Sequence, residues 1–79
     1  MNINTQLGMR IRYLRKQKGM SIEDLSLEAN INRNYLSDLE RGVRNPTILI
    51  IEKIARSLDI SISDLFKGIQ SFEDWYIIT

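Results

Sequence analysis

Residues 21–41, SIEDLSLEANINRNYLSDLER, are the stretch that decides the fold. The spacing of their apolar residues predicts two short helices joined by a tight turn. Ser21 and Asp24 have the separation of a helix cap, in which the serine hydroxyl accepts from the third helical amide and an acid lies in the first turn. Asn30 tolerates the left-handed conformation that a helix stop requires. We therefore expect the first of these helices between Ser21 and Asn30.

The second helix is predicted to begin almost at once, with Asn32 as its N-cap. Ile31 and Leu36 have the spacing of a hydrophobic staple, which would fix the angle at which the chain enters the helix. Gly42 is a ready C-terminal stop. The pattern therefore predicts a helix over 32–41 that packs through one side.

The other side of this helix carries side chains that can read DNA bases. Arginine can hold guanine O6 and N7 with two hydrogen bonds, asparagine can do the same to adenine N6 and N7, and aspartate can accept from cytosine N4. These residues fall in the first two turns, the part of a recognition helix that reaches base edges. The candidate base-reading residues are Arg33, Asn34, Ser37 and Asp38. Composition alone fits an ordinary solvated polar face equally well.

Residues 19–66 resemble the helix-turn-helix domains of the phage Cro/C1 repressor type, also called the XRE family. The matching segments are GMSIEDLSLEANINRNYLSDLERG and NPTILIIEKIARSLDISISDLF, about three-fifths of the chain. The segment INRNYLSDLERGVRN also resembles the small controller proteins of restriction–modification systems. The resemblance implies an all-α fold: a compact five-helix lambda-repressor-like DNA-binding domain with a helix-turn-helix over residues 1–68. A short apolar C-terminal segment at 69–79 lies outside it.

Three residues depart from the family pattern. Ile22 stands where the family commonly has a glutamine whose side chain reaches the DNA backbone, so this chain lacks that group. Ser26 replaces a usual alanine, and it is small enough to let another helix cross closely. Asn30 replaces a usual glycine at the helix stop.

Candidate phosphate contacts surround the predicted recognition helix. Arg12 and Lys16 lie four apart on the predicted first helix, where a solvated cationic face fits each of them at least as well. The resemblance places Arg44 and Asn45 in a loop that passes the DNA backbone. Tyr35 either packs against the neighbouring helix or offers its hydroxyl to a phosphate, and packing is favoured. The candidate phosphate-binding residues are Arg12, Lys16, Ser21, Tyr35, Arg41, Arg44 and Asn45.

The resemblance implies a different role for Arg15. In the family this position forms an ion pair with the glutamate near the end of the recognition helix, which is Glu40 here. The pair would tie the first helix to the recognition helix and hold the latter in place. An exposed pair of this kind would add only about 1 kcal/mol or less.

The 79-residue length allows one small domain, whose core supplies a net stability so small that a partner subunit would help. No apolar run approaches the roughly 18 residues of a membrane span, and the N-terminus lacks an apolar signal core. We therefore expect a cytoplasmic protein, nucleoid-associated when bound to DNA. Cysteine and histidine are absent, which removes disulfides, zinc fingers, thiolate nucleophiles and the commonest general base. No glycine-rich phosphate loop is present either, so neither an enzyme nor a cofactor is expected.

The net charge of +1 is distributed unevenly along the chain. Residues 1–18 contain five lysines and arginines and no acid, whereas residues 59–79 contain four acids and one lysine. Such a gradient gives a small domain a basic side that can face phosphate.

Caps and apolar stripes predict three further helices. They span 4–18, 47–58 and 61–66. Their expected N-caps are Asn4 or Thr5, then Thr47 and Ser61. The side chains expected to point inward are Leu7, Ile11, Leu14, Ile48, Ile51, Ile54, Ala55, Leu58, Ile62, Leu65 and Phe66.

Apolar residues beyond those that one core needs indicate a second buried surface. On the fourth predicted helix they fit either a dimer contact or a fully enclosed helix. In the tail they either fold back over the first and fifth helices or join two subunits, and the enrichment of aromatic residues at interfaces favours the second. The candidate dimer-interface residues are Leu49, Ile50, Phe72, Trp75 and Tyr76.

These patterns predict a transcriptional regulator: a symmetric homodimer that presents the helix at 32–41 to successive major grooves of double-stranded DNA. The half-sites would lie about 10 bp apart in a roughly palindromic operator. Asp38 would be repelled by phosphate unless it meets a cytosine amine or pairs with Arg33. Two alternatives use the same fold, a protein-interaction module and an antitoxin that binds both DNA and a toxin. Ile22 and the low net charge favour the interaction module, whereas the basic first helix and the adjacent Arg33 and Asn34 oppose it.

Overall fold

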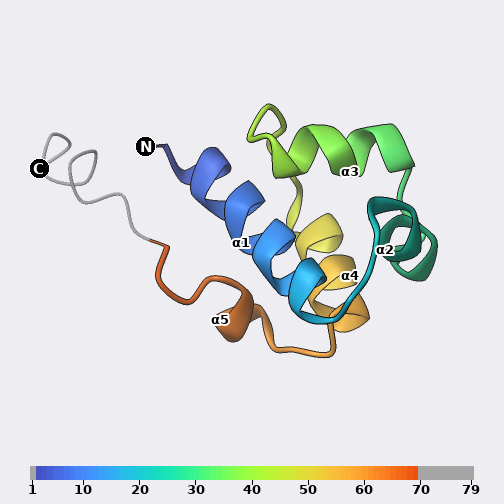
Figure 1. Cartoon of the computed structure of the whole chain (residues 1–79). Coiled ribbons are helices and arrows are strands. Elements are labelled where there is room, and N and C mark those ends of the chain that lie inside the picture. The colour runs from blue at the N-terminus through green and yellow to red at the C-terminus, as the bar shows by residue number, and fades with distance from the viewer. Residues whose placement is uncertain (1, 70–79) are drawn as a thin grey trace, which may run out of the picture.

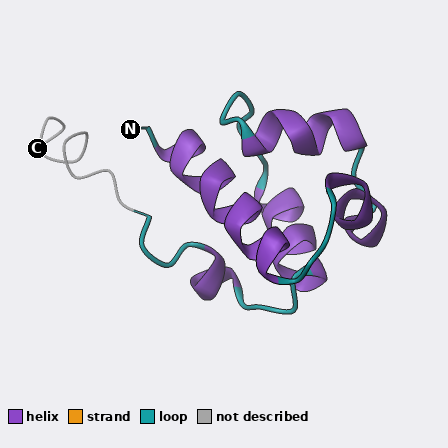
Figure 2. Cartoon of the chain, in the orientation of Figure 1, coloured by secondary structure: helices purple, strands orange, loops and turns teal. Residues whose placement is uncertain are grey.

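The computed structural model describes residues 2–69, which form five helices and, within that range, no strand (Figures 1 and 2). The helices are α1 Ile3–Gln17, α2 Ile22–Ala29, α3 Arg33–Glu40, α4 Ile48–Ser57 and α5 Ile62–Leu65. The predicted all-α, five-helix fold is confirmed. Across residues 2–69, no helix combines the length and apolar character that crossing a membrane requires.

One predicted cap is wrong. Asn2, rather than Asn4 or Thr5, caps α1, and its side-chain oxygen accepts a hydrogen bond from the Thr5 backbone N–H at 2.8 Å. The helix therefore begins at Ile3, one residue earlier than expected, and ends at Gln17. The predicted caps Ser21, Asn32, Thr47 and Ser61 are all present.

The helices enclose one core, to which every helix contributes. Contacts join α1 to α3, α3 to α2, α2 to α4 and α4 to α5, and all five helices place side chains in the same apolar cluster. The buried apolar side chains are Leu7, Ile11, Leu25, Ala29, Leu36, Leu39, Ile51, Ile54, Ala55, Leu58 and Leu65. Leu14 and Phe66, both expected to point inward, are partly buried against this cluster.

Two residues expected in the core are exposed instead. Ile48 and Ile62 are 75% and 41% exposed. Each is the first residue after its cap, and the buried face of its helix begins three positions later, at Ile51 and Leu65. The buried stripe of each helix therefore begins one turn later than the apolar pattern predicts.

The turn between α2 and α3 forms as the sequence predicts. Ser21 and Asp24 cap α2 reciprocally, and Asn30 ends it in the left-handed region with φ 55°. The Ile31 backbone N–H then donates to the Ser26 carbonyl oxygen at 2.9 Å, which closes the turn. Ile31 packs against the core, as a hydrophobic staple at the start of α3 requires. The two helices of the motif therefore have a defined relative orientation.

Helix α1 approaches the end of α3 so closely that only glycine fits between them. A Cβ atom at Gly8 would fall on the backbone carbonyl oxygens of Leu39 and Glu40, inside van der Waals contact. One turn earlier, Thr5 lies against Gly42, which ends α3 with φ 81°. The backbones of α1 and α3 are thus in direct contact.

Replacement of Gly8 with alanine tests this contact. The added methyl group meets backbone atoms that cannot rotate away, so the free energy of unfolding should fall by about 1–3 kcal/mol despite the better helix propensity of alanine. Gln17→Ala, at an exposed position of the same helix, should change it by less than about 0.5 kcal/mol. Urea unfolding of both variants measures the difference, and a Gly8→Ala protein as stable as the wild type would contradict the close packing.

Candidate nucleic-acid interface

One side of α3 is buried and the opposite side is free. Leu36 and Leu39 are fully buried, whereas Arg33 and Asn34 in the first turn are exposed. The remaining predicted base-reading residues, Ser37 and Asp38, are partly buried one turn further on. The structure therefore places the four predicted base-reading residues on the first two turns of a helix that is anchored through its apolar side.

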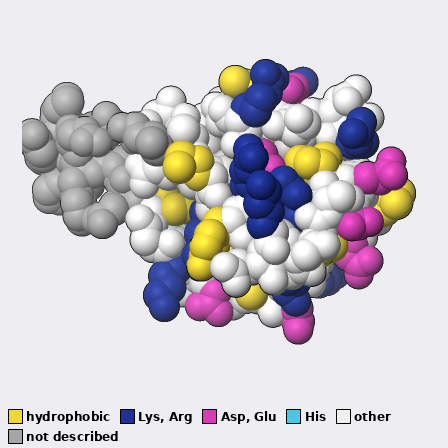
Figure 3. Space-filling view, viewed as in Figure 1, with side chains coloured by type: hydrophobic (Ala, Val, Ile, Leu, Met, Phe, Trp, Pro, Cys, Tyr) yellow, Lys and Arg dark blue, Asp and Glu magenta, His cyan; other side chains and the backbone are white. Residues whose placement is uncertain are grey.

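Cationic side chains lie around this helix. In Figure 3 the lysines and arginines gather over α1 and over the end of α3, and the acids gather over α2. Most of the candidate phosphate-binding residues are exposed, namely Arg12, Lys16, Ser21, Arg41, Arg44 and Asn45. Tyr35 is partly buried and packs against the core, which agrees with the favoured packing role.

Several of these polar groups already have partners within the protein. Ser21 Oγ accepts from the Asp24 backbone N–H at 3.0 Å, and the Asn45 side-chain oxygen accepts from Asn4 Nδ2. The Arg44 guanidinium lies 5.4 Å from the centre of the Tyr35 ring, within cation–π range. These contacts give Ser21, Asn45 and Arg44 defined positions on the surface of the protein.

Asp38 pairs with two arginines, neither of which is Arg33, the side chain considered above as an alternative to a cytosine amine. Its Oδ1 atom accepts from Arg41 Nη2 at 2.7 Å, and its Oδ2 atom accepts from Arg44 Nη2 and Nε at 3.2 and 3.3 Å. Arg41 is three residues along the helix and shares a side with Asp38, whereas Arg33 is five residues away and does not. The hydrogen bond from Arg41, followed by that from Arg44, lowers the pKa of the Asp38 carboxyl, so the acid is ionised at neutral pH.

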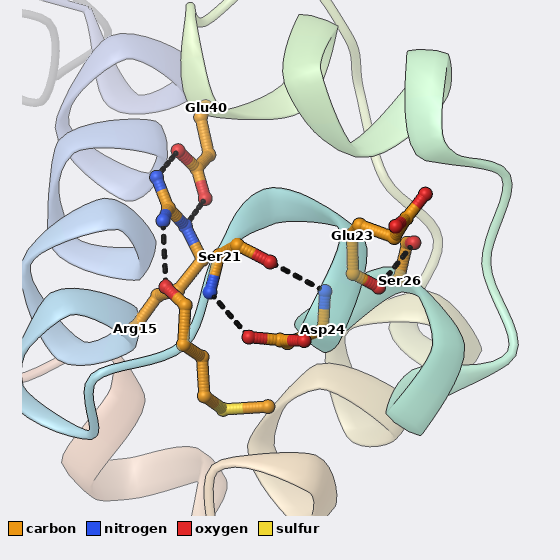
Figure 4. Close-up of polar contacts among 7 residues, drawn as sticks. Arg15, Ser21, Glu23, Asp24, Ser26 and Glu40 are labelled. Carbon is orange, nitrogen blue, oxygen red and sulfur yellow. Dashed lines mark hydrogen bonds and ion pairs between the residues drawn. The ribbon is translucent and has the colours of Figure 1, made fainter.

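Arg15 and Glu40 form the ion pair that the resemblance implies, and the pair is buried rather than exposed (Figure 4). Arg15 Nε donates to Glu40 Oε2 at 2.7 Å, and Nη2 donates to Oε1 at 2.9 Å. The remaining guanidinium nitrogen, Nη1, donates to the Met20 carbonyl oxygen at 2.8 Å. The two side chains are only 8% and 6% exposed. Hydrogen bonding to Glu40 raises the pKa of Arg15 against the opposing effect of burial, so the buried guanidinium remains charged.

The polar groups of α2 are also satisfied beside this pair (Figure 4). The Asp24 carboxylate accepts from the Ser21 backbone N–H at 2.8 Å, and this bond is the main cause of its lowered pKa. The buried Ser26 hydroxyl donates to the Glu23 carbonyl oxygen at 2.8 Å, which explains how a serine replaces the usual alanine. Within residues 2–69, no group of three or more acidic, histidine or cysteine side chains could hold a metal ion.

The residues predicted at a dimer interface have different positions. Leu49 is 61% exposed, as a contact surface requires, but Ile50 is partly buried and packs against the core of its own chain. Phe72, Trp75 and Tyr76 lie outside the described residues.

Two residues that position the interface were not predicted. Arg10 donates from Nη2 to the Asp64 carbonyl oxygen at 2.8 Å and from Nε to that of Leu65 at 3.4 Å, which joins α1 to α5. Gly8 allows the close contact between α1 and α3. A glycine inside a helical pattern was a usable signal for the second of these, because it often marks a close approach. The pairing of Arg10 with backbone atoms of a distant helix has no signal in a single sequence.

Comparison with known proteins places the chain in a family. The family model described as Helix-turn-helix matches residues 11–65. The control protein C.BamHI of Bacillus amyloliquefaciens is 42% identical over 65 residues, which are 81% of this chain and 80% of that protein. The chain spans about half the length of other regulators it matches, such as 41% of SlrR of Bacillus subtilis (39% identical) and 54% of DdrOP3 of Deinococcus deserti (37% identical).

Two solved structures of similar proteins contain DNA. The biofilm regulator SinR in complex with DNA is 39% identical, with a TM-score of 0.73 over 77% of this chain and 98% of that chain. The controller protein C.Esp1396I, a tetramer in complex with its natural 35 base-pair operator, is 34% identical, with a TM-score of 0.78 over 85% of this chain and 88% of that chain. The family match over residues 11–65 and the agreement in fold lead to one conclusion: the chain belongs to the helix-turn-helix family of the Cro/C1, or XRE, type.

Proposed function

We propose that this protein is a cytoplasmic transcriptional regulator that binds specific sequences of double-stranded DNA as a homodimer. The observation that carries the proposal is the free polar side of α3, which is anchored through Leu36 and Leu39 and bordered by exposed cations. The DNA in the SinR and C.Esp1396I complexes supports it, because both proteins share this fold and more than 30% of their aligned residues with this chain.

The mechanism divides the contacts into two kinds. Exposed arginines and lysines on α1 and after α3 bind phosphate and set the position of the protein on the duplex, without carrying sequence information. Arg33 and Asn34, in the first turn of α3, can then form two-point hydrogen bonds with guanine and adenine edges in the major groove. Ser37 and Asp38 contact the neighbouring base pairs.

A second subunit would supply the second α3. Leu49 at 61% exposure, together with the adjacent Ile48 at 75%, offers apolar surface on α4 for a subunit contact. Two copies related by a two-fold axis would bind half-sites about one helical turn apart. In this proposal residues 1–68 bind DNA, and the segment 69–79 contributes to packing or to the dimer.

Selection of bound duplexes from a random pool tests the function directly. The proposal predicts enrichment of a roughly palindromic site with half-sites about 10 bp apart. A pool that remains unselected, although the folded protein is present at micromolar concentration and low salt, would contradict the proposed function.

Arg33→Ala tests the assignment of base reading. The loss of a two-point contact with one base should cost roughly 1–3 kcal/mol of binding free energy at the selected site and should relax the preference at one position per half-site. Competition binding with single-base variants of that site measures both effects. Arg33 does not read a base if its replacement weakens binding to every duplex equally.

A further inference from the structure

The position of Asp38 poses a problem for a DNA-binding surface. Its side chain is 27% exposed on the proposed reading side of α3, where the negative charge would be repelled by phosphates. In the free protein the charge is compensated within the surface itself, by Arg41 at 2.7 Å and Arg44 at 3.2 Å. These two arginines are also candidates for phosphate contact. Asp38 therefore occupies the two guanidinium groups that would otherwise be available to bind DNA phosphates.

The contacts of the two arginines show what must change on binding. Arg44 uses both Nε and Nη2 on the Asp38 carboxylate, so one full edge of its guanidinium is occupied. Arg41 uses Nη2. The arginine side chains are 51% and 68% exposed, so solvent and phosphate can both reach them. Ion pairs this exposed are weak and exchange readily.

We propose that Asp38 is an internal counterion, which Arg41 and Arg44 exchange for DNA phosphates when the protein binds, so that Asp38 determines specificity by opposing binding to random sequence. This inference rests on the proposed DNA-binding function. On random DNA the carboxylate loses both arginine partners and gains none, so binding is weakened by the cost of breaking the two ion pairs. On a sequence that places a cytosine amine opposite Asp38, the carboxylate accepts a hydrogen bond from N4 and the penalty is removed.

The exchange has a measurable ionic signature. When an arginine leaves a carboxylate for a phosphate, the DNA releases a counterion but the carboxylate takes up a cation from solution. The net ion release is therefore smaller than the number of phosphate contacts suggests. Removal of the Asp38 carboxylate should therefore increase the net number of ions released when the protein binds DNA.

Asp38→Asn tests the proposal, because it removes the charge and keeps the size of the side chain. The matched control is Glu52→Gln on α4, which makes the same change in net charge and also releases an exposed arginine, Arg56, from a pair at 3.4 Å. Affinity is measured for the selected operator and for a random duplex across a range of salt concentrations. A third protein carries Asp38→Asn together with Arg41→Ala and Arg44→Ala, and a fourth carries the two arginine changes alone.

Relative to Glu52→Gln, the Asp38→Asn protein should bind random duplex about threefold to tenfold more tightly, the range expected for two exposed ion pairs. The slope of log affinity against log salt should steepen by about one unit. The ratio of operator to random affinity should fall, and Asp38→Asn should have little effect once both arginines are alanine.

Equal behaviour of Asp38→Asn and Glu52→Gln would overturn the inference while leaving the DNA-binding function intact. So would an effect of Asp38→Asn that persists in full without the two arginines, because the acid would then act on DNA directly. Failure of the wild-type protein to bind any duplex would instead overturn the proposed function on which the inference rests.

Discussion

The contact between α1 and α3 is the constraint on which the rest of the structure depends. Both contacts fall at the end of α3: the backbone of Leu39 and Glu40 touches α1 at Gly8, where no larger residue fits, and the Glu40 side chain forms a buried pair with Arg15. A buried ion pair gains little net stability over apolar packing, but removal of one partner is costly because an unpaired charge remains. The pair therefore permits one arrangement of the two helices and penalises others. It holds α3 from the side that faces the protein and leaves the opposite side free.

The other features of the proposed DNA-binding surface follow from this arrangement. Because α3 is held by α1, the cations of α1 and those that follow α3 lie near the same free side (Figure 3). The turn at Asn30 and Ile31 sets the angle between α2 and α3, and the core beneath them is shared by all five helices. The candidate base-reading residues are therefore carried by a packed helix, whereas Arg44 and Asn45 lie in the loop that follows it. The side chains that pair with one another at the surface can exchange these partners for DNA. Asp38, Arg41 and Arg44 are such side chains.

Local signals in the sequence predicted most of the fold, because most of its elements begin and end with local chemistry. Caps at Ser21, Asn32 and Thr47 depend on residues within one turn, and their side chains form the expected hydrogen bonds. Apart from the cap of α1, where Asn2 takes the place of Asn4 or Thr5, the predictions were wrong where burial depends on residues distant in the sequence. Ile48 and Ile62 fit the apolar stripe of their helices but extend past the surface that covers them.

The site was predictable to a similar extent. The polar side of α3 follows from helical periodicity, and the family resemblance identified the partner of Arg15. The structure pairs Asp38 with Arg41 and Arg44 rather than with Arg33, and a single sequence does not define the course of the loop that carries Arg44. Arg10 reaches carbonyl groups more than fifty residues away, and no pattern of side chains encodes that contact.

The most direct test of this account is native-state hydrogen exchange of the α3 amides in a Glu40→Gln protein, with Glu28→Gln at an exposed position of α2 as the control. Loss of the Glu40 charge leaves the buried Arg15 without its counterion. Protection of the α3 amides should then fall by roughly 100-fold, the equivalent of about 3 kcal/mol, and by more than that of the α4 amides. The same protection of α3 in the Glu40→Gln and Glu28→Gln proteins would contradict the claim that the buried pair holds this helix in place.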